Sequence, residues 1–467
     1  MKPPARREFL RTLGAGAAAA ALPGLRTPSA AEEPKMPRPN ILFLLSDDQR
    51  HDTLHALGNA LIQTPALDAL VRRGVAFTHP YIMGGNQGAV CVPSRAMLLT
   101  GRTLWRCERR LPEGALLWPE AFRQAGYTTF GTGKWHNGPA WFARCFDGGD
   151  AIFFGGMHSH LQFPVHSFDP SGKYPKAAAG TSAKFSSELF SDAAIQFLRS
   201  HKGPKPFFLY LAYTAPHDPR MAPRKYQDMY PPDKIPVPRN FLPQHPFDNG
   251  ELKIRDEQLA PWPRTPEVIQ KHIADYYAMI THMDEQIGRV VAALDETGHA
   301  NDTLVIFAGD NGLALGQHGL MGKQSVYEHS IRVPLVLAGP GIPAGERRDA
   351  FAYLLDLFPT ACEMAGVPTP KSVEGKSLVP ILKGEAKAVR DSVFAAYRDV
   401  QRSVSDGRFK LIAYTVRGAR RAQLFDLAND PWEMHDLSAD PAHAPKLAEL
   451  QARLAEWQRQ TGDPLVS

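Results

Sequence analysis

Apolar runs of strand length alternate along the chain with segments of helical periodicity. The strand-length runs occupy residues 41–45, 127–130, 207–213, 303–308 and 334–338. Residues 266–294 repeat apolar positions at helical spacing shortly before the fourth run. This alternation is typical of an α/β protein, in which helices cover both faces of a mainly parallel sheet. We therefore predict a large mixed, mainly parallel sheet sandwiched by helices within residues 37–371.

The pattern changes near the end of the chain. Residues 392–397, 409–414 and 423–427 are short apolar runs of the kind expected for antiparallel strands. Residues 441–460 have the spacing of a helix. We predict that residues 372–467 form a small α+β subdomain, in which this closing helix packs on an antiparallel sheet.

Two long segments, residues 137–182 and 218–265, lack regular periodicity. Loops of this size in a compact domain are usually lids or binding walls. A disordered linker is the alternative, but both segments contain aromatic residues such as Trp141, Phe153 and Trp262. Disordered segments contain few aromatic residues. We therefore expect the two segments to form walls of a substrate site.

The first 31 residues have the order of an export signal. Residues 6–11 read RREFLR, an alanine-rich apolar stretch follows, and small residues surround Ala31. This order predicts a signal of the twin-arginine type, recognised by the Tat translocon and cleaved near Ala31. A first helix of the folded protein is the alternative, but Gly14, Gly16 and Pro23 would interrupt it. We expect a periplasmic or secreted protein.

Charge and hydropathy argue against two classes of function. The formal net charge is +5, yet the chain without residues 1–31 has 48 Lys and Arg against 47 Asp and Glu. This balance gives no electrostatic argument for binding nucleic acid. No run of 18 or more apolar residues is present, so we expect no stable membrane insertion. The four cysteines have no C-x-x-C spacing and predict no disulfide framework, although one bond among Cys107, Cys145 and Cys362 stays open.

Acidic side chains follow two of the predicted strands. Asp47 and Asp48 come directly after the first strand, and Asp310 and Asn311 come after the fourth. The carboxyl ends of parallel strands lie at one edge of a sheet, where α/β proteins bind ligands. Oxygen ligands suit hard cations, and crowded carboxylates favour a bound cation. One aspartate pair alone is more often a helix cap or a turn, but two such pairs at two strand ends predict a metal site.

Basic and nucleophilic side chains occupy similar positions. Lys134 and His136 follow the second predicted strand, and His217 follows the third. Pro93 suits the first turn of a helix, so we expect Cys91 at a helix N-terminus, where the helix dipole favours negative charge. Each residue alone has an ordinary structural explanation, such as a buried thiol or a solvated lysine. Their joint position at strand ends favours an active site.

The order of these residues resembles that of type I sulfatases. Residues 91–95 read CVPSR, which is similar to the site that this family converts to formylglycine. Further similar motifs are SDDQ at 46–49, GKWH at 133–136, PH at 216–217, DNG at 310–312, GQHG at 316–319, GK at 322–323 and GKSL at 375–378. The resemblance covers most of the chain after residue 37, and it implies an alkaline phosphatase-like fold.

The resemblance implies two chemical groups beyond the ordinary side chains. Cys91 would be converted to 3-oxoalanine, the formylglycine, by a formylglycine-generating enzyme during maturation. A divalent metal, Ca²⁺ or alternatively Mg²⁺, would be bound by Asp47, Asp48, Asp310 and Asn311 together with the modified Cys91. A sulfate ester is negatively charged, so a cation near its oxygens assists attack by a nucleophile.

The resemblance also implies catalytic roles. Arg95 would fix the hydrated aldehyde, while Lys134 and Lys323 would hold the sulfate group. His217, with Lys323, would protonate the departing alcohol oxygen after in-line attack on sulfur. His136 would then accept a proton from the second hydroxyl, so that sulfate leaves and the aldehyde forms again. Weaker candidates for contact with substrate are Arg50, Asn86, Trp105, Asp218 and His318.

We therefore predict a sulfatase, a sulfuric ester hydrolase that releases an alcohol and inorganic sulfate. Export favours a sulfated carbohydrate as substrate, although sulfated small molecules fit the same core. A formylglycine-dependent phosphonate monoester or phosphodiester hydrolase is the nearest alternative. An alkaline phosphatase agrees less well, because it would have Ser or Thr at position 91. From another class, a glycan-binding protein without catalysis would keep its glycan affinity after Cys91→Ala.

Overall fold

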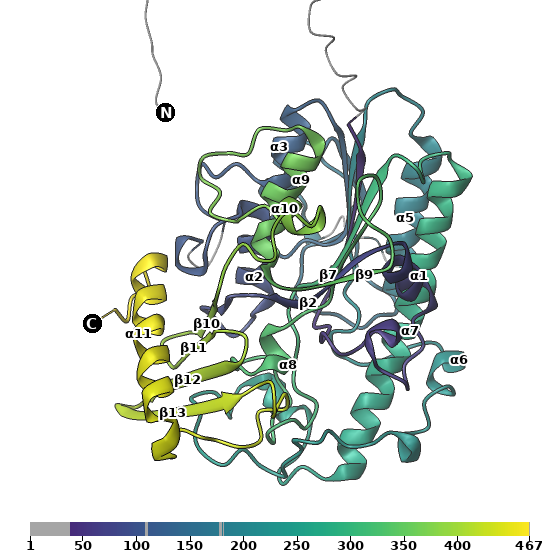
Figure 1. Ribbon diagram of the computed structural model, residues 1–467. Helices are drawn as coiled ribbons and strands as arrows, with labels where there is room; N and C mark the ends of the chain where they lie inside the picture. Colours follow the sequence, from purple (N-terminus) through teal and green to yellow (C-terminus); the bar gives the residue numbers. More distant parts are fainter. Residues whose placement is uncertain (1–37, 108–110, 177–179, 181, 467) are drawn as a thin grey trace, which may run out of the picture. The chain divides into compact units, whose positions relative to one another are not determined.

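The computed structural model describes residues 38–107, 111–176, 180 and 182–466, and the predicted export signal lies outside them. Within these residues the main sheet has eight strands in the order β5-β4-β6-β1-β7-β8-β2-β9 (Figure 1). They are β1 (Asn40–Ser46), β2 (Gly74–Tyr81), β4 (Thr128–Lys134), β5 (Gly148–Phe153), β6 (Phe207–Ala212), β7 (Thr303–Gly309), β8 (Leu335–Ala338) and β9 (Glu346–Tyr353). Only β8 runs antiparallel to its neighbours in this part of the chain. The predicted mixed, mainly parallel sheet is confirmed.

Helices cover both faces of this sheet (Figure 1). One face carries α2 (Cys91–Thr100), α3 (Trp118–Gln124), α4 (Pro139–Cys145), α9 (Leu357–Ala365) and α10 (Val379–Leu382), and the other carries α1 (Pro65–Arg73), α5 (Ser186–Ser200) and α7 (Pro266–Glu296). Successive side chains of a strand point to opposite faces. Phe43 of β1 therefore packs in one core with Trp118, while Leu44 packs in the other with Ile280. The predicted helix layers are thus confirmed.

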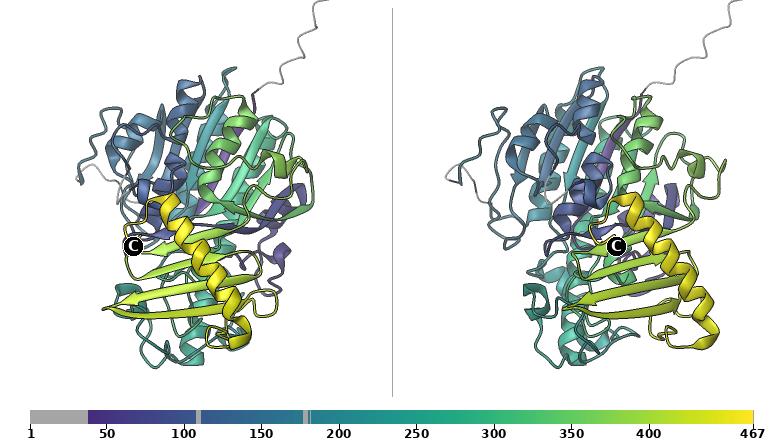
Figure 2. Two further views of the ribbon diagram at one scale, coloured as in Figure 1. Left: turned by 60° about the vertical axis from the view of Figure 1, so that its left-hand side comes forward. Right: turned by 90° about the vertical axis from the view of Figure 1, so that its left-hand side faces the viewer.

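A second sheet has five strands in the order β13-β12-β11-β10-β3 within the described chain (Figure 2). These strands are β3 (Gly84–Gly85), β10 (Val393–Tyr397), β11 (Gln401–Ser405), β12 (Phe409–Val416) and β13 (Ala419–Asp426). β10 to β13 are antiparallel, and α11 (Ala444–Thr461) packs across them. The predicted strands and the closing helix are present, and β11 was not predicted. β3 pairs with β10 in parallel, which ties this sheet to the segment directly before α2.

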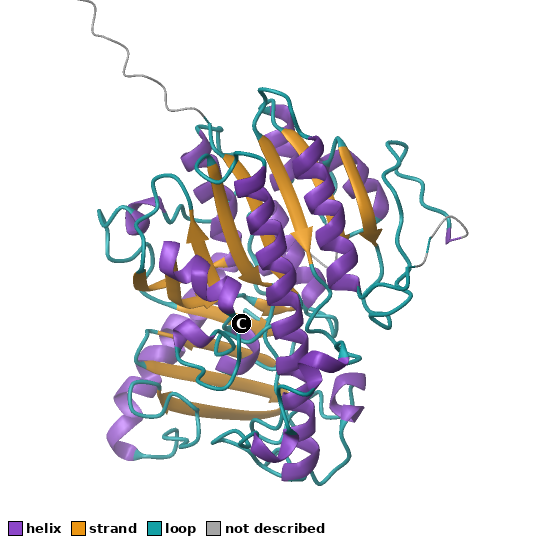
Figure 3. Cartoon of the chain, turned by 90° about the vertical axis from the view of Figure 1, so that its right-hand side faces the viewer, coloured by secondary structure: helices purple, strands orange, loops and turns teal. Residues whose placement is uncertain are grey.

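Strands at the edges of the main sheet differ from the sequence prediction (Figure 3). Residues 137–182 were expected to lack regular structure, but they contain α4 and the edge strand β5. β5 reads GGDAIF, and the first half of β9, the opposite edge, is charged and largely exposed. Such strands lack the continuous apolar run of a strand buried on both faces. Residues 218–265 contain only α6 (Arg224–Gln227) and short 3-10 turns.

Four neighbouring strands bring the predicted chemical residues together. β4, β6, β1 and β7 are adjacent and parallel, so their carboxyl ends meet at one edge of the sheet. The short helix α8 (Glu328–Ile331) lies further along the chain after β7.

None of the described helices combines the length and the apolar character needed to cross a membrane.

Candidate active site

Cys91 is the first residue of α2, as the position of Pro93 predicted. Its side chain is almost fully buried, and burial raises the pKa of the thiol. The sulfur lies 3.4 Å from Nδ1 of His136 and 3.8 Å from Nζ of Lys134, two residues that follow or end β4. The structure therefore brings the predicted nucleophile position together with a base and a cation.

The aspartates after β1 and β7 lie beside one another. Asp48 has a φ of 62°, in the left-handed region that residues other than glycine rarely adopt. Two hydrogen bonds hold it there: its backbone N–H donates to Oδ1 of Asp310 at 3.0 Å, and its carbonyl accepts from the Tyr276 hydroxyl at 2.6 Å. The amide of Asn311 donates to Oδ1 of Asp48 at 2.7 Å. This turn directs the two strand ends toward the same point.

Three cations pair with the three carboxylates of this cluster. Lys134 Nζ contacts Oδ2 of Asp47, and Lys323 Nζ donates to Oδ1 of Asp48 at 2.6 Å. Arg95, on α2, donates to Oδ2 of Asp310 at 2.8 Å. Its second contact is the carbonyl of Lys134, at 2.7 Å, which fixes the guanidinium between the two strands. All of these side chains are buried, where charges are tolerated only when they are paired.

The cluster shifts the pKa values of its members in opposite directions. Burial raises the pKa of Asp47, but the nearby Lys134, His217 and Arg95 lower it more, so that the pKa lies well below its usual range. Burial and the charge of Asp47 raise the pKa of Asp310 to about 7. Neighbouring carboxylates that differ in this way are typical of functional sites.

The residues of this cluster fit a divalent cation. Oδ1 of Asp47 and Oδ1 of Asn311 are buried and have no hydrogen-bond partner among the described residues. Ligand atoms of Asp47, Cys91 and Asp310 all lie within 4.8 Å of one another. Buried oxygen atoms with unused lone pairs are the donors that Ca²⁺ and Mg²⁺ prefer. The chain thus has a candidate metal site made of the acidic residues that the sequence indicated.

Two histidines lie beside the cluster. His217, after β6, donates from Nδ1 to the carbonyl of Asp218 at 2.8 Å, and its Nε2 lies 3.6 Å from Oδ2 of Asp48. His136 directs Nδ1 toward Cys91. Burial and the charge of Lys134 lower the pKa of His136 to about 2, so its imidazole is neutral at physiological pH.

The five weaker candidates for substrate contact lie in different parts of the structure. Asp218 lines a narrow cavity together with Asp48 and Lys323. Asn86 lies between β3 and α2. Three candidates contact other parts of the protein.

Those three residues have specific partners. The guanidinium of Arg50 forms an ion pair with Asp52 at 2.8 Å. The ring of His318 stacks on Tyr327 with 4.0 Å between centroids. Trp105 packs under the guanidinium of Arg402. The partners of all three residues lie outside the acidic cluster.

Arg220 is a cavity residue that the sequence interpretation missed. It lines the narrow cavity with Asp48 and Lys323, and its Nε and Nη2 atoms are buried without a hydrogen-bond partner among the described residues. Nη1 lies 3.0 Å from Nδ1 of His272. Arg255 borders the same region and donates to Oδ1 of Asp218 at 2.9 Å. The only sequence signal was the position of Arg220, three residues after His217.

Comparison with known proteins identifies the family. The model of the family described as Sulfatase matches residues 39–367, and the one described as N-sulphoglucosamine sulphohydrolase, C-terminal, matches residues 316–460. The chain therefore belongs to the sulfatase family, and it is a sulfuric ester hydrolase of the alkaline phosphatase-like superfamily.

Individual relatives cover nearly the whole chain. The N-acetylglucosamine-6-O-sulfatase of Bacteroides thetaiotaomicron is 27% identical over 91% of this chain and 87% of the relative. A solved structure, of a protein in complex with its substrate D-glucosamine-2-N,6-O-disulfate, has a TM-score of 0.78 at 24% identity and covers 92% of this chain and 99% of that chain. The structure of the phosphonate monoester hydrolase of Agrobacterium radiobacter has a TM-score of 0.73 at 24% identity, and the match covers 91% of this chain and 96% of that chain. The two structural likenesses show the fold.

Proposed function

We propose that the protein hydrolyses a sulfate ester of a carbohydrate to an alcohol and inorganic sulfate, with residue 91 as formylglycine. The observation that carries the proposal is the position of Cys91 at the start of α2, where Lys134, His136 and the acidic cluster surround it. The catalytic fold would comprise residues 37–371, and residues 372–467 would form a second, smaller domain.

The two groups that the family resemblance implies would complete this arrangement. A formylglycine at position 91 supplies a hydrated aldehyde as nucleophile, and a divalent cation, Ca²⁺ or Mg²⁺, supplies Lewis-acid polarisation. Asp47, Asp48, Asp310 and Asn311 would hold the cation beside residue 91. Elemental analysis of the purified protein would identify the ion.

The cations of the cluster would bind the sulfate group. Lys134 and Lys323 are buried beside the nucleophile position, so their charges act in a poorly screened environment where attraction to the sulfate oxygens is strong. Arg95 is fixed by Asp310 and by the carbonyl of Lys134, and it would orient the group at position 91.

The two histidines would move protons at different atoms. Nδ1 of His217 donates to a carbonyl, so Nε2 is the atom that faces the cluster and would protonate the departing alcohol oxygen. His136 is held neutral and would accept a proton at Nδ1 from the group at position 91.

A sulfated carbohydrate is the substrate class that the relatives support. One relative is named an N-acetylglucosamine-6-O-sulfatase, and one similar structure contains a sulfated glucosamine. The proposed twin-arginine signal at residues 1–31 would export the enzyme to the periplasm or out of the cell, where it would encounter sulfated glycans. An Arg6→Lys/Arg7→Lys variant that remains in the cytoplasm would support export by this route.

The first test is the mass of the tryptic peptide formed by residues 74–95 of the exported protein. A peptide lighter than the thiol form by the cysteine-to-aldehyde change supports a formylglycine. Sulfate release from sulfated glycans, choline sulfate and aryl sulfates then defines the substrate. An unmodified thiol, from a host that modifies another sulfatase, would contradict the proposal. The same panel should include a phosphodiester and a phosphonate monoester, because the fold is shared with a phosphonate monoester hydrolase.

Arg220 should contribute to substrate binding. Its two unpartnered nitrogens can donate to an anionic or hydroxyl group of the substrate. Arg220→Ala should lower kcat/KM by roughly tenfold to a hundredfold, mostly through KM, because a hydrogen bond to a charged group contributes about 1.5–3 kcal/mol. Arg224→Ala is the matched control, since this nearby arginine is exposed and its ion pair within the described chain is with Asp228. Equal values of kcat/KM for the two variants would show that Arg220 does not contribute to substrate recognition.

A further inference from the structure

A second cavity is lined in part by Arg50, His51 and Asp52 of the loop after β1. Its volume is about 680 Å³, within the range of small-molecule sites. It shares no lining residue with the narrow cavity at Lys323. Asp48 lines the narrow cavity, while Arg50, two residues later, lines the larger one. The same loop therefore borders both cavities without joining them.

The larger cavity has an excess of positive charge. Among the described residues, one carboxylate lines it, that of Asp52, together with four arginines, which are Arg50, Arg239, Arg332 and Arg347. His51 also lines it, and burial lowers the pKa of this histidine to about 3, so it adds no charge at neutral pH. Such a wall attracts an anion, and arginine is the side chain best suited to bind sulfate-like or carboxylate groups through paired hydrogen bonds.

Arg50 has a donor that nothing in the described chain uses. Its side chain is 4% exposed, and its Nε and Nη2 donate to the two oxygens of Asp52 at 2.8 and 3.1 Å. Nη1 is buried without a partner. A buried donor that stays unpaired is costly, and an oxyanion in the cavity would satisfy it.

The other arginines differ in the donors that are free for a ligand. Arg332 donates from Nε to the carbonyl of Thr78 at 2.8 Å, and Arg347 donates from Nη2 to the carbonyl of Ala56 at 2.6 Å. Nη2 of Arg332 also contacts the Thr78 carbonyl, and its Nη1 lies 3.7 Å from Oε2 of Glu328, so Arg332 is held in place and already paired. Arg347 is exposed and uses only part of its five N–H groups on the Ala56 carbonyl, which leaves donors for a ligand. Arg239 is exposed at the cavity.

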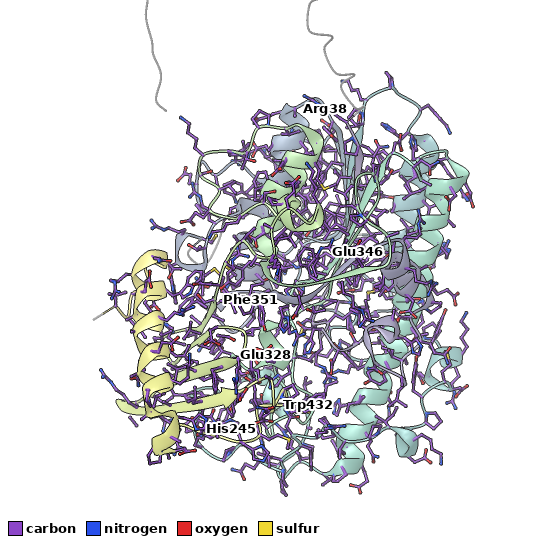
Figure 4. All side chains as sticks on the ribbon, viewed as in Figure 1. Arg38, His245, Glu328, Glu346, Phe351 and Trp432 are labelled. Carbon is purple, nitrogen blue, oxygen red and sulfur yellow. The ribbon has the colours of Figure 1, made fainter. Side chains whose placement is uncertain are left out.

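Aromatic residues form part of the remaining wall. Phe77, Tyr277 and Trp432 line the cavity; Phe77 and Tyr277 are buried, and Trp432, labelled below Glu328 in Figure 4, is partly exposed. The flat face of an aromatic ring packs well against the apolar C–H face of a sugar ring. Polar groups that fix orientation, combined with such a wall, are the composition of a small-molecule site.

We propose that this cavity is a second, non-catalytic binding site for a saccharide that carries a sulfate or carboxylate group. The ligand class is that of the proposed substrate, and in this respect the inference rests on the proposed function. Binding here requires neither turnover nor the group at position 91. The site would hold an anionic saccharide on the enzyme while a separate sulfate ester is cleaved at the active site.

The test is calorimetric titration of the full-length Cys91→Ala protein, which cannot turn the ligand over, with N-acetylglucosamine 6-sulfate. The same titration is made with unsulfated N-acetylglucosamine and with inorganic sulfate. An Arg239→Ala/Arg347→Ala variant should bind the sulfated sugar at this site at least about tenfold more weakly, because charge-assisted hydrogen bonds are lost. Cleavage of a small aryl sulfate by the same double variant, with Cys91 intact, should be unchanged. Arg417→Ala/Arg420→Ala, which removes two exposed arginines elsewhere, is the matched control.

The outcomes separate the two proposals. Two binding events, one of which is lost in the Arg239→Ala/Arg347→Ala protein, support the second site. A single event lost in that variant also supports it, and shows that the active site does not take this sugar. If the Arg239→Ala/Arg347→Ala variant binds the sulfated sugar as the parent protein does, the second site is overturned, whether or not the protein shows sulfatase activity. Equal affinity for inorganic sulfate, or for the unsulfated sugar, overturns its assignment to an anionic saccharide.

Discussion

Cys91→Ala should reduce sulfate release by at least about 10³-fold, since removal of a catalytic nucleophile has effects of this size or larger. The side chain is 1% exposed and contacts Lys134 and His136 through weak thiol interactions. Alanine cannot be converted to the aldehyde, and it leaves the ion pairs of the acidic cluster in place. The melting temperature should therefore stay close to that of the parent protein, and the measurement is sulfate release at equal amounts of folded enzyme.

The chain offers a matched control for this variant. Cys362, on α9, is also buried and free, but it lies in the hydrophobic core. Cys362→Ala should keep activity within about twofold, with a loss of stability of about 1 kcal/mol from the small cavity. If Cys91→Ala retained the activity of the control, the nucleophile would have to be sought elsewhere in the cluster.

The interior of the fold could be predicted from the sequence because its strands are buried on both faces. β1, β6 and β7 are continuous apolar runs with every residue buried. β5 and β9 at the sheet edges are partly exposed, so their sequences mix glycine or charged residues with apolar ones. Such strands are specified by pairing with a neighbour far along the chain, which a local pattern does not contain.

The same division applies to the site. Residues that directly follow a buried strand, such as Asp47 and Asp310, could be placed because the topology brings parallel strand ends together. For Arg50 and His318 the sequence shows only their position beside or within a motif, and in the structure their side chains contact Asp52 and Tyr327. Side-chain direction depends on neighbours distant in the sequence. The sequence therefore indicates which residues meet at the strand ends, but not the directions of the side chains around them.

A buried ion cluster joins α8 to the second sheet. Lys410 of β12 contacts Oε1 of Glu328 at 2.9 Å and Oε1 of Glu433 at 2.8 Å, and all three side chains are buried. The Tyr81 hydroxyl donates to Oε2 of Glu328 at 2.8 Å. Glu328 is labelled in Figure 4. Arg332 also lies 3.7 Å from Oε2 of Glu328, so Glu328 has two cationic partners, whereas Lys410 is the cation that faces Glu433 at this junction.

Lys410→Met should lower the free energy of unfolding by about 3–5 kcal/mol, because it leaves the buried Glu433 without a counter-charge, while Glu328 keeps Arg332. The loss should depend on pH. Burial raises the pKa of Glu433 to about 7 even with Lys410 present, and removal of the lysine raises it further. A carboxyl whose pKa is higher in the folded than in the unfolded state stabilises the fold below its unfolded pKa, and this stability is lost as pH rises. The deficit should therefore be smaller at pH 5 than at pH 8.

Urea unfolding of the parent and variant proteins at both pH values measures this difference. Lys446→Met is the matched control, because Lys446 also contacts two carboxylates, Asp406 and Glu449, at 3.3 and 2.6 Å, but at the partly exposed surface. Such surface pairs contribute about 0–1 kcal/mol. Equal losses in the two variants would mean that Lys410 acts as an ordinary surface charge. A loss that does not change between pH 5 and pH 8 would show that the lost packing of the lysine chain, rather than the unpaired carboxylate, destabilises the junction.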